Sequence, residues 1–220
     1  MKIFQTIIFA VCAFLLQAQT ADFNASIKRY NLVNVATIDP SISVNLKYAT
    51  TDNFVHRNMY GTFKTAYLHP SAAMALKAAL KQLKKVDPNY SFIIYDAARP
   101  VSVQRIMWQA VKGTPNEKYV ARPHRGGPHN YGIAVDIALT YKGVPVDMGT
   151  PFDTFSTDAH ITNEAQLVKR GRITEQARKN RMLLRKVLTD NGFRTYSREW
   201  WHFTRYDMKY TRAHIKLLNF

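Results

Sequence analysis

The chain has 220 residues, 46% of them hydrophobic and 12% aromatic, so one sizeable hydrophobic core is expected rather than a disordered chain. Lys and Arg outnumber Asp and Glu by 31 to 15, and the formal charge is +16. Such an excess is typical of proteins with anionic partners, of which nucleic acid and an anionic cell-envelope surface are two.

The N-terminus has the layout of a secretory signal peptide. Lys2 precedes an apolar run, Ile3–Leu16, and small residues follow at Ala18 and Ala21. The run is about 14 residues long, whereas a membrane-spanning helix needs roughly 20. We therefore predict cleavage after Ala18, with an uncleaved anchor helix as the alternative.

These features divide the chain into a signal peptide over residues 1–18, an N-terminal segment over 19–39 and one domain over 40–220. Export to the bacterial periplasm is expected, with no stable membrane span after removal of the leader. Export argues against a nucleic-acid partner, and no nucleic-acid motif is found. An anionic cell-envelope surface is then the expected partner of the basic chain, and simple solubility explains the charge equally well.

Cysteine occurs once, as Cys12, inside the apolar run of the leader. The mature chain is therefore expected to contain no disulfide, no thiol nucleophile and no cysteine metal site. A lipoprotein cysteine is the alternative, but Val11 precedes it and the leader before it is short.

After the leader, the pattern alternates helices with short strands. Alternation over residues 41–48 predicts an edge strand, and Pro70 begins a helix that stops before Asp87. The buried face of this helix is predicted to contain Met74, Leu76, Leu80 and Leu83. The next expected elements are a strand over 91–96, a helix from Pro100 to Val111, a loop over 112–131, a strand over 133–139, a turn at Lys142-Gly143, a helix over 175–191 and paired strands within 193–204. This order predicts a single α+β domain with a small, mostly antiparallel sheet packed with helices.

Two residue types that bind metals stand close together in GGPHNYGIAVDIAL, residues 126–139. His129 follows a turn, and Asp136 lies inside an apolar strand where an unpaired carboxylate would be costly. His202 in the motif EWWH adds a third ligand type beside Glu199. Two histidines and one aspartate leave one open position on Zn²⁺, as catalytic zinc sites require, and Glu199 is then free to act as a general base. The alternative is that Asp136 pairs with an arginine and that the aromatic motif is simply core.

Several motifs together resemble a known family. The pattern GxHxxGxAxD at 127–136 and EWWH at 199–202 resemble the zinc D-alanyl-D-alanine dipeptidases, which are related to zinc D,D-carboxypeptidases of cell-wall peptides. KYATTDNF (47–54), YDAARP (95–100) and MGTPFDTF (148–155) are similar to further segments of that family. The resemblance spans about residues 40–206 and places the zinc site on the sheet.

The resemblance implies a role for each matching position. The implied ligands of one zinc ion per chain are His129, Asp136 and His202. The implied catalytic residues are Glu199 as the base and Arg99 as the group that stabilises the developing oxyanion. The implied contacts of the substrate ammonium are Asp153 and Tyr48. We further expect Asp96, three residues before Arg99, to orient nearby groups.

The resemblance implies an exported zinc dipeptidase that cleaves D-Ala-D-Ala, and D-alanine recycling or scavenging is the expected purpose. A buried Asp153 favours a free amino terminus, because a longer peptide would leave the carboxylate unpaired. Gly127 stands where the family usually has serine, which is expected to loosen or enlarge a subsite. A broader D,D-carboxypeptidase or endopeptidase, and a non-catalytic cell-wall binding module, are the alternatives. His124 and His160 are expected to lie outside the site.

Overall fold

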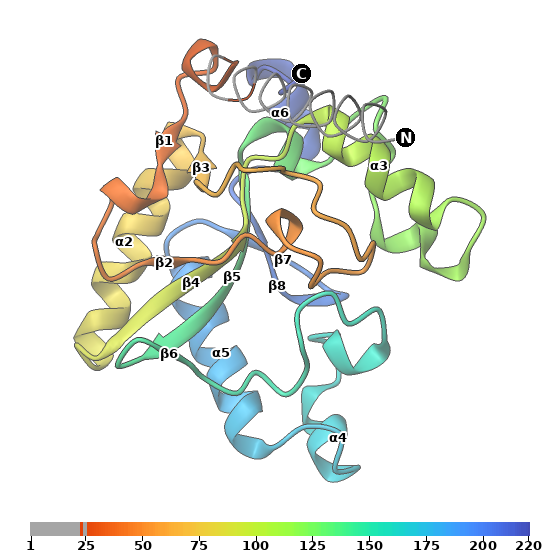
Figure 1. Ribbon diagram of the computed structural model, residues 1–220. Coiled ribbons are helices and arrows are strands. Elements are labelled where there is room, and N and C mark those ends of the chain that lie inside the picture. The colour runs from red at the N-terminus through yellow and green to blue at the C-terminus, as the bar shows by residue number, and fades with distance from the viewer. Residues whose placement is uncertain (1–22, 24–25) are drawn as a thin grey trace, which may run out of the picture.

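The computed structural model describes Phe23 and residues 26–220 (Figure 1). The predicted signal peptide, residues 1–18, lies outside the described residues, and so does Cys12. Within the predicted N-terminal segment, β1 (Val33–Asn34) pairs antiparallel with β3 (Tyr67–Leu68). None of the helices in the described part of the chain combines the length and apolar character that a membrane span requires.

The larger sheet carries the site. Within the described residues it has six strands in the order β2-β4-β5-β8-β7, with β6 paired to β5. Their bounds are β2 (Ser43–Val44), β4 (Tyr90–Asp96), β5 (Ala134–Tyr141), β6 (Val144–Pro145), β7 (Arg194–Tyr196) and β8 (Glu199–Thr204). Every pairing in it is antiparallel except that of β2 with β4. The prediction of an α+β domain with a small, mostly antiparallel sheet is confirmed.

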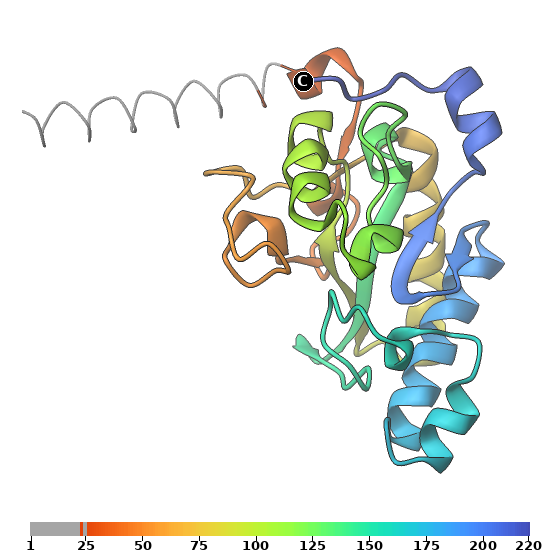
Figure 2. The same cartoon turned by 90° about the vertical axis from the view of Figure 1, so that its right-hand side faces the viewer.

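Helices and loops cover the two faces of this sheet differently. The long helices α2 (Pro70–Val86) and α5 (Glu175–Asp190) pack side by side on one face (Figure 2). The other face is covered by α3 (Val101–Val111) and by the irregular chain between β2 and β3. Shorter helices among the described residues include α4 (Glu164–Lys169), α6 (Met208–His214) and the 3₁₀ turns η1 (Val35–Thr37), η2 (Lys47–Ala49), η3 (Pro115–Tyr119), η4 (Pro128–Tyr131) and η5 (Thr157–Ala159).

Helix α2 begins at Pro70 as predicted, but one of the four residues predicted on its buried face is exposed. Leu76, Leu80 and Leu83 are buried, whereas Met74 is 68% exposed. The buried face instead includes Ala72, Ala73, Ala75 and Ala79. Small side chains let the helix approach the sheet closely, so the core face follows the alanines rather than the larger methionine.

The predicted turn at Lys142-Gly143 and the predicted edge strand are both present. Lys142 and Gly143 both have positive φ, 51° and 80°, as a two-residue hairpin turn between β5 and β6 requires. Strand β2 lies at the edge of the sheet but is shorter than the alternation in 41–48 suggested. The chain leaves β2 into η2, which buries Tyr48.

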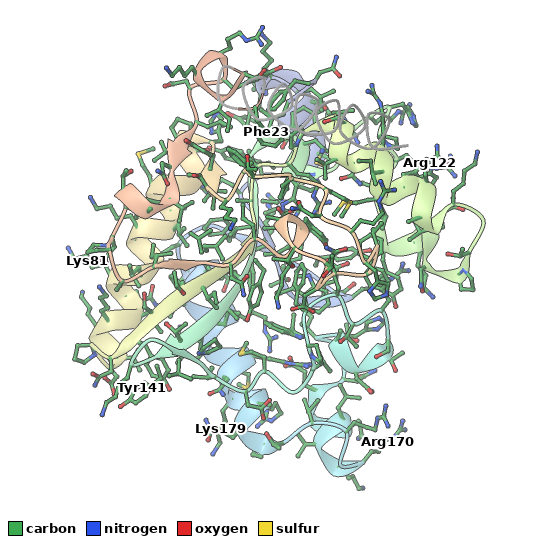
Figure 3. The ribbon with its side chains drawn as sticks, in the orientation of Figure 1. Phe23, Lys81, Arg122, Tyr141, Arg170 and Lys179 are labelled. Carbon is green, nitrogen blue, oxygen red and sulfur yellow. The ribbon has the colours of Figure 1, made fainter. Side chains whose placement is uncertain are left out.

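The positive charge of the chain is spread around its surface. Exposed basic side chains such as Lys81, Arg122, Arg170 and Lys179 point outward on different sides of the molecule (Figure 3). The interior contains mainly hydrophobic side chains, with a small set of buried polar residues. Several of those polar residues, among them Asp96, Arg99, His129 and Asp136, gather at one end of β5.

Candidate active site and metal centre

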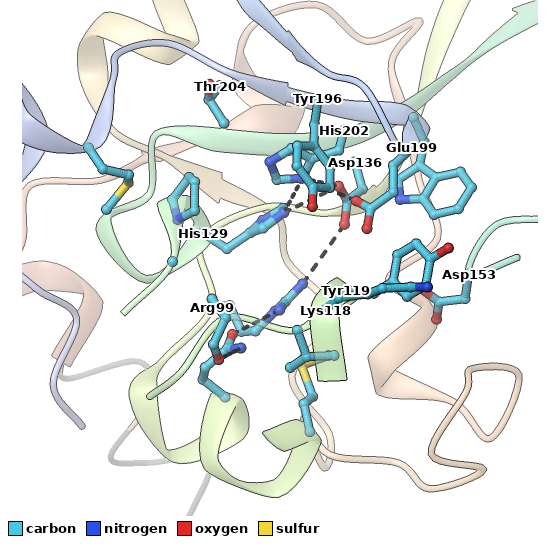
Figure 4. A pocket seen from close by; sticks show the side chains of 18 of the residues that line it. Arg99, Lys118, Tyr119, His129, Asp136, Asp153, Tyr196, Glu199, His202 and Thr204 are labelled. Carbon is cyan, nitrogen blue, oxygen red and sulfur yellow. Dashed lines mark hydrogen bonds and ion pairs between the residues drawn. The ribbon is translucent and has the colours of Figure 1, made fainter. Parts of the chain in front are cut away.

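The three candidate metal ligands come together from separate elements. His129 lies in η4, Asp136 in β5 and His202 in β8, where Asp136 and His202 are direct cross-strand partners. The Asp136 Oδ1 atom lies 3.2 Å from His129 Nε2 and 2.9 Å from His202 Nδ1. The two ring nitrogens are 3.1 Å apart. Figure 4 shows the three side chains pointing toward one another.

This spacing fits a bound metal ion. Ligand bonds of about 2.0–2.2 Å in a tetrahedral arrangement put neighbouring donor atoms about 3.3 Å apart. The three observed separations are within a few tenths of an ångström of that value. His129, Asp136 and His202 therefore form a possible metal site, and two imidazoles with one carboxylate are a ligand set that suits zinc.

Neighbouring groups fix the orientation of His129. Its Nδ1 donates a hydrogen bond to the carbonyl of Ala97 at 2.7 Å, which leaves Nε2 without the proton and free to bind a metal. The η4 turn that carries His129 ends at Gly132, whose φ is +67°. A Cβ atom there would lie 3.2 Å from the backbone nitrogen of His69, so the turn needs glycine both for its conformation and for space.

Burial and the two imidazoles act in opposite directions on Asp136. Burial alone would raise its pKa, but His129 and His202 hold the pKa of the carboxyl well below its ordinary range. Burial lowers the pKa of His202, which favours the neutral ring that metal binding requires. The buried carboxylate of Asp136 therefore lies against two imidazole nitrogens and is not left without polar partners in the apolar strand.

Glu199 lies beside these ligands in a pocket of about 380 Å³ (Figure 4). The pocket is lined by all seven predicted site residues: Tyr48, Arg99, His129, Asp136, Asp153, Glu199 and His202. Glu199 is 9% exposed, and its Oε2 lies 3.9 Å from His202 Nδ1. Burial, with the carboxylates of Asp136 and Asp153 nearby, raises the pKa of Glu199 well above its ordinary value. Three carboxylates around one pocket make it a favourable place for a cation.

Arg99 approaches the same pocket from the opposite side. Its Nε and Nη2 donate to Asp96 Oδ2 at 2.8 and 2.5 Å, and its Nη2 lies 3.8 Å from Asp136 Oδ2. Asp96 is fully buried and also accepts a hydrogen bond from the Tyr60 hydroxyl at 2.7 Å. Asp96 therefore contacts and orients Arg99, and Arg99 presents a fixed positive charge at the pocket.

Unlike Asp96, Asp153 has no cationic partner among the ion pairs of the described residues. Its carboxylate accepts hydrogen bonds from uncharged groups. Its Oδ1 accepts from the Tyr48 hydroxyl at 2.9 Å, and its Oδ2 from the Phe54 N–H at 3.4 Å. Burial raises the pKa of Asp153 to about 7, although the Tyr48 hydrogen bond opposes this. The Tyr48 ring also faces the Arg99 guanidinium, 4.9 Å from its centroid. A cationic ligand group would satisfy this carboxylate.

Sequence reasoning missed a residue that supports Arg99. Gln104 is 1% exposed; it accepts from Arg99 Nη1 at 2.9 Å and donates to the Ala121 carbonyl at 2.8 Å. A glutamine on the otherwise apolar face of α3 was the available signal. His124 and His160 do not line the pocket, in line with the expectation that they lie outside the site.

The backbone at Gly127 is closely packed against Ala121. A Cβ atom built on Gly127 would lie 2.8 Å from the Cβ of Ala121, closer than two such atoms approach one another. Ala121 thus occupies the space next to Gly127, and Gln104 fixes the carbonyl of Ala121. A side chain at position 127 would therefore require this loop to move.

This contact predicts that Gly127→Ser destabilises the protein by about 1 kcal/mol, because overpacking forces the Ala121 loop to move. Adding Ala121→Gly removes the opposing methyl group and should recover most of the loss. Urea unfolding of the single and double variants measures the coupling. Strictly additive effects of the two substitutions would contradict the contact.

Comparison with known proteins agrees with the geometry. The sequence model of the family described as D-ala-D-ala dipeptidase matches residues 28–219, which is most of the chain. The chain belongs to this family. It is therefore a peptidase by family, and the resemblance seen in the sequence motifs is confirmed.

Curated relatives carry the same name. The chain is 34% identical over 175 residues to the D-alanyl-D-alanine dipeptidase of Escherichia coli K12, covering 78% of this chain and 83% of the relative. It is 28% identical over 181 residues to that of Enterococcus faecalis V583, covering 74% and 86%. The D-alanyl-D-alanine dipeptidase of Enterococcus faecium is 29% identical over 195 residues, covering 77% and 88%.

Proposed function

We propose that the chain is an exported, zinc-dependent dipeptidase that hydrolyses D-Ala-D-Ala with a free amino terminus to D-alanine. The family and the names of its relatives support the reaction and the substrate. The choice of a dipeptide rests on one observation, the buried Asp153 carboxylate in the same pocket as the candidate metal ligands.

Asp153 supports this choice through the cost of burying a charge. A free ammonium group paired with its carboxylate would compensate the burial that raises its pKa to about 7. A blocked or extended amino terminus would put a neutral amide there and leave the carboxylate without a cation. Tyr48 assists by holding Oδ1 in place, so that one face of the carboxylate stays directed into the pocket.

One zinc ion per chain would be held by His129, Asp136 and His202. When bound, zinc polarises a carbonyl group and lowers the pKa of water. The Ala97 carbonyl sets the orientation of His129, so that its Nε2 lies beside the Asp136 Oδ1 and His202 Nδ1 atoms.

The other residues of the pocket would move the proton and stabilise charge. Glu199 accepts the proton of the attacking water and passes it to the nitrogen of the leaving D-alanine. Arg99, fixed by Asp96 and Gln104, provides a positive charge for the oxyanion that forms as water adds to the carbonyl.

We also propose where the enzyme acts and what its reaction is for. The leader-like residues 1–18 support export to the periplasm, where a D,D-dipeptide released from the cell wall would be available. Recycling or scavenging of D-alanine follows, because an exported enzyme would not reach a cytoplasmic precursor. The basic surface would favour contact with an anionic envelope.

The substrate panel that tests this proposal contains D-Ala-D-Ala, N-acetyl-D-Ala-D-Ala and a murein pentapeptide ending in D-Ala-D-Ala. We expect D-alanine release from the free dipeptide alone. Comparable release from the blocked dipeptide or from the pentapeptide would contradict the role of Asp153 and indicate a carboxypeptidase. Absence of release from all three by metal-loaded protein would contradict the substrate class.

The pKa of Asp153 predicts how substrate affinity depends on pH. Only the ionised carboxylate attracts an ammonium group, so protonation below pH 7 should weaken binding and raise KM. For a single group of pKa about 7, KM should rise about eightfold between pH 7.5 and pH 6. Steady-state kinetics on D-Ala-D-Ala measure this, with Asp153→Asn as the control that should lose the dependence. A pH-independent KM in the parent protein would contradict the assignment.

A further inference from the structure

The segment that presents Asp153 contains no α-helix and no strand. It runs from Asp147, just after β6, to Asp158, which lies in the short 3₁₀ turn η5. Asp153 itself has φ of +60°, a conformation that residues other than glycine adopt infrequently. Contacts from outside the segment are therefore needed to hold this carboxylate in one position.

Arg181 of α5 supplies those contacts from beneath the segment. Its side chain is completely buried. Nε donates to the Met148 carbonyl at 2.6 Å, Nη1 to the Asp158 carbonyl at 3.0 Å and Nη2 to Thr150 Oγ1 at 3.4 Å. One planar guanidinium thus binds the chain on both sides of Asp153.

The same cluster connects the segment to the strand that carries Glu199. Trp200 Nε1 donates to Thr150 Oγ1 at 2.8 Å, and the Arg181 guanidinium lies 5.7 Å from the centroid of the Trp200 ring. Trp200 directly follows Glu199 in β8. Arg181 therefore fixes the Asp153 segment relative to the end of β8.

Among the described residues, Arg181 makes no close ion pair with a carboxylate. Its nearest carboxylate, Glu164, is 3.9 Å away and is bound more closely by Arg185, at 2.6 and 3.2 Å. Burial lowers the pKa of Arg181 to about 10, which shows that desolvation outweighs the attraction of Glu164. The principal partners of this buried cation are the oxygens of the Asp153 segment.

We infer that Arg181 is a positioning residue that sets the Asp153 carboxylate in the pocket and thereby the enzyme's affinity for a free amino terminus. This rests on the proposed function, in which Asp153 binds the substrate ammonium. Arg181 is about two turns from the end of α5 nearest Asp147 and does not line the pocket, so it acts only through the segment.

Arg181→Met tests this, because methionine fills similar apolar space but donates no hydrogen bond. We expect KM for D-Ala-D-Ala to rise about tenfold while kcat changes less than about threefold, as expected when substrate binding rather than chemistry is lost. Zinc content should stay at the parent value. The matched control is Arg185→Met on the next turn of α5, which loses contact with Glu164 but not with the segment, and whose KM should not change.

Thr150→Val provides a second route if Arg181→Met does not fold. It keeps the buried arginine but removes the oxygen shared by Arg181 and Trp200, and KM should rise about threefold. An unchanged KM in each folded variant, or a fall in kcat at constant KM, would overturn the inference. An equal rise in KM for Arg185→Met would also overturn it.

Asp153→Asn separates this inference from the proposed function. If that variant leaves KM for the free dipeptide unchanged, the ammonium site itself is wrong. If Asp153→Asn raises KM and Arg181→Met and Thr150→Val do not, the ammonium site stands and only the role of Arg181 fails.

Discussion

Replacing Glu199 by alanine is expected to lower kcat on D-Ala-D-Ala about a thousandfold and to leave the metal content unchanged. General acid–base groups typically contribute 10²- to 10⁴-fold, and Glu199 is the carboxylate that lies next to the candidate ligands without being one of them. Measuring kcat together with zinc per chain separates loss of the base from loss of the metal.

Glu175→Ala is the matched control for this variant. Glu175 is an exposed glutamate of α5 that pairs with Arg178 and does not line the pocket. Its kcat should equal that of the parent protein. If kcat of Glu199→Ala is within about threefold of the parent value, Glu199 is not the general base.

Replacing Asp153 by asparagine is expected to raise KM for D-Ala-D-Ala about a hundredfold. Loss of one partner of a buried charge pair costs about 2–5 kcal/mol, and each 1.4 kcal/mol is tenfold in affinity. Asparagine tolerates the positive φ of position 153 and still accepts the Tyr48 hydrogen bond, so the backbone should be preserved.

The discriminating measurement for Asp153→Asn is the ratio of kcat/KM for the free and the N-acetylated dipeptide. This ratio should fall sharply, because the variant no longer prefers an ammonium group, and zinc content should not change. Loss of zinc in parallel with activity would mean that Asp153 acts on the metal site and not on the substrate.

One residue of the site was predictable because it breaks a local rule, whereas the roles of Arg99, Asp153 and Tyr48 were implied only by the family resemblance. Asp136 stood out as a carboxylate within an apolar strand, and the structure places it between two imidazoles. The Lys142-Gly143 turn and the start of α2 at Pro70 follow from backbone preferences that act over a few residues. Local preferences of this kind can be recognised from a single sequence.

The misses have a different physical origin. Two-residue strands such as β1 and β3 have no periodicity to detect, and the parallel pairing of β2 with β4 depends on contacts distant in sequence. Met74 was placed in the core with Leu76, Leu80 and Leu83 by helical spacing, whereas close packing of α2 selects alanines. The short helix α6 was also missed.

The two residues that support the site, Gln104 and Arg181, were not predicted from the sequence for a related reason. Gln104 and Arg181 bind main-chain carbonyl groups, which every residue possesses, so no partner motif marks them. Their polar side chains occupy otherwise buried helix faces, and that is the signal such residues leave in a sequence. The predicted site residues, in contrast, all line one pocket.

The most direct test of the account is D-alanine release from D-Ala-D-Ala by protein stripped of metal and then titrated with zinc. We predict that stripping abolishes release and that one equivalent of zinc per chain restores it, with no restoration in His129→Ala, which lacks one of the three candidate ligands. Full activity in the stripped protein, or a requirement for more than one equivalent, would contradict a single catalytic zinc held by His129, Asp136 and His202.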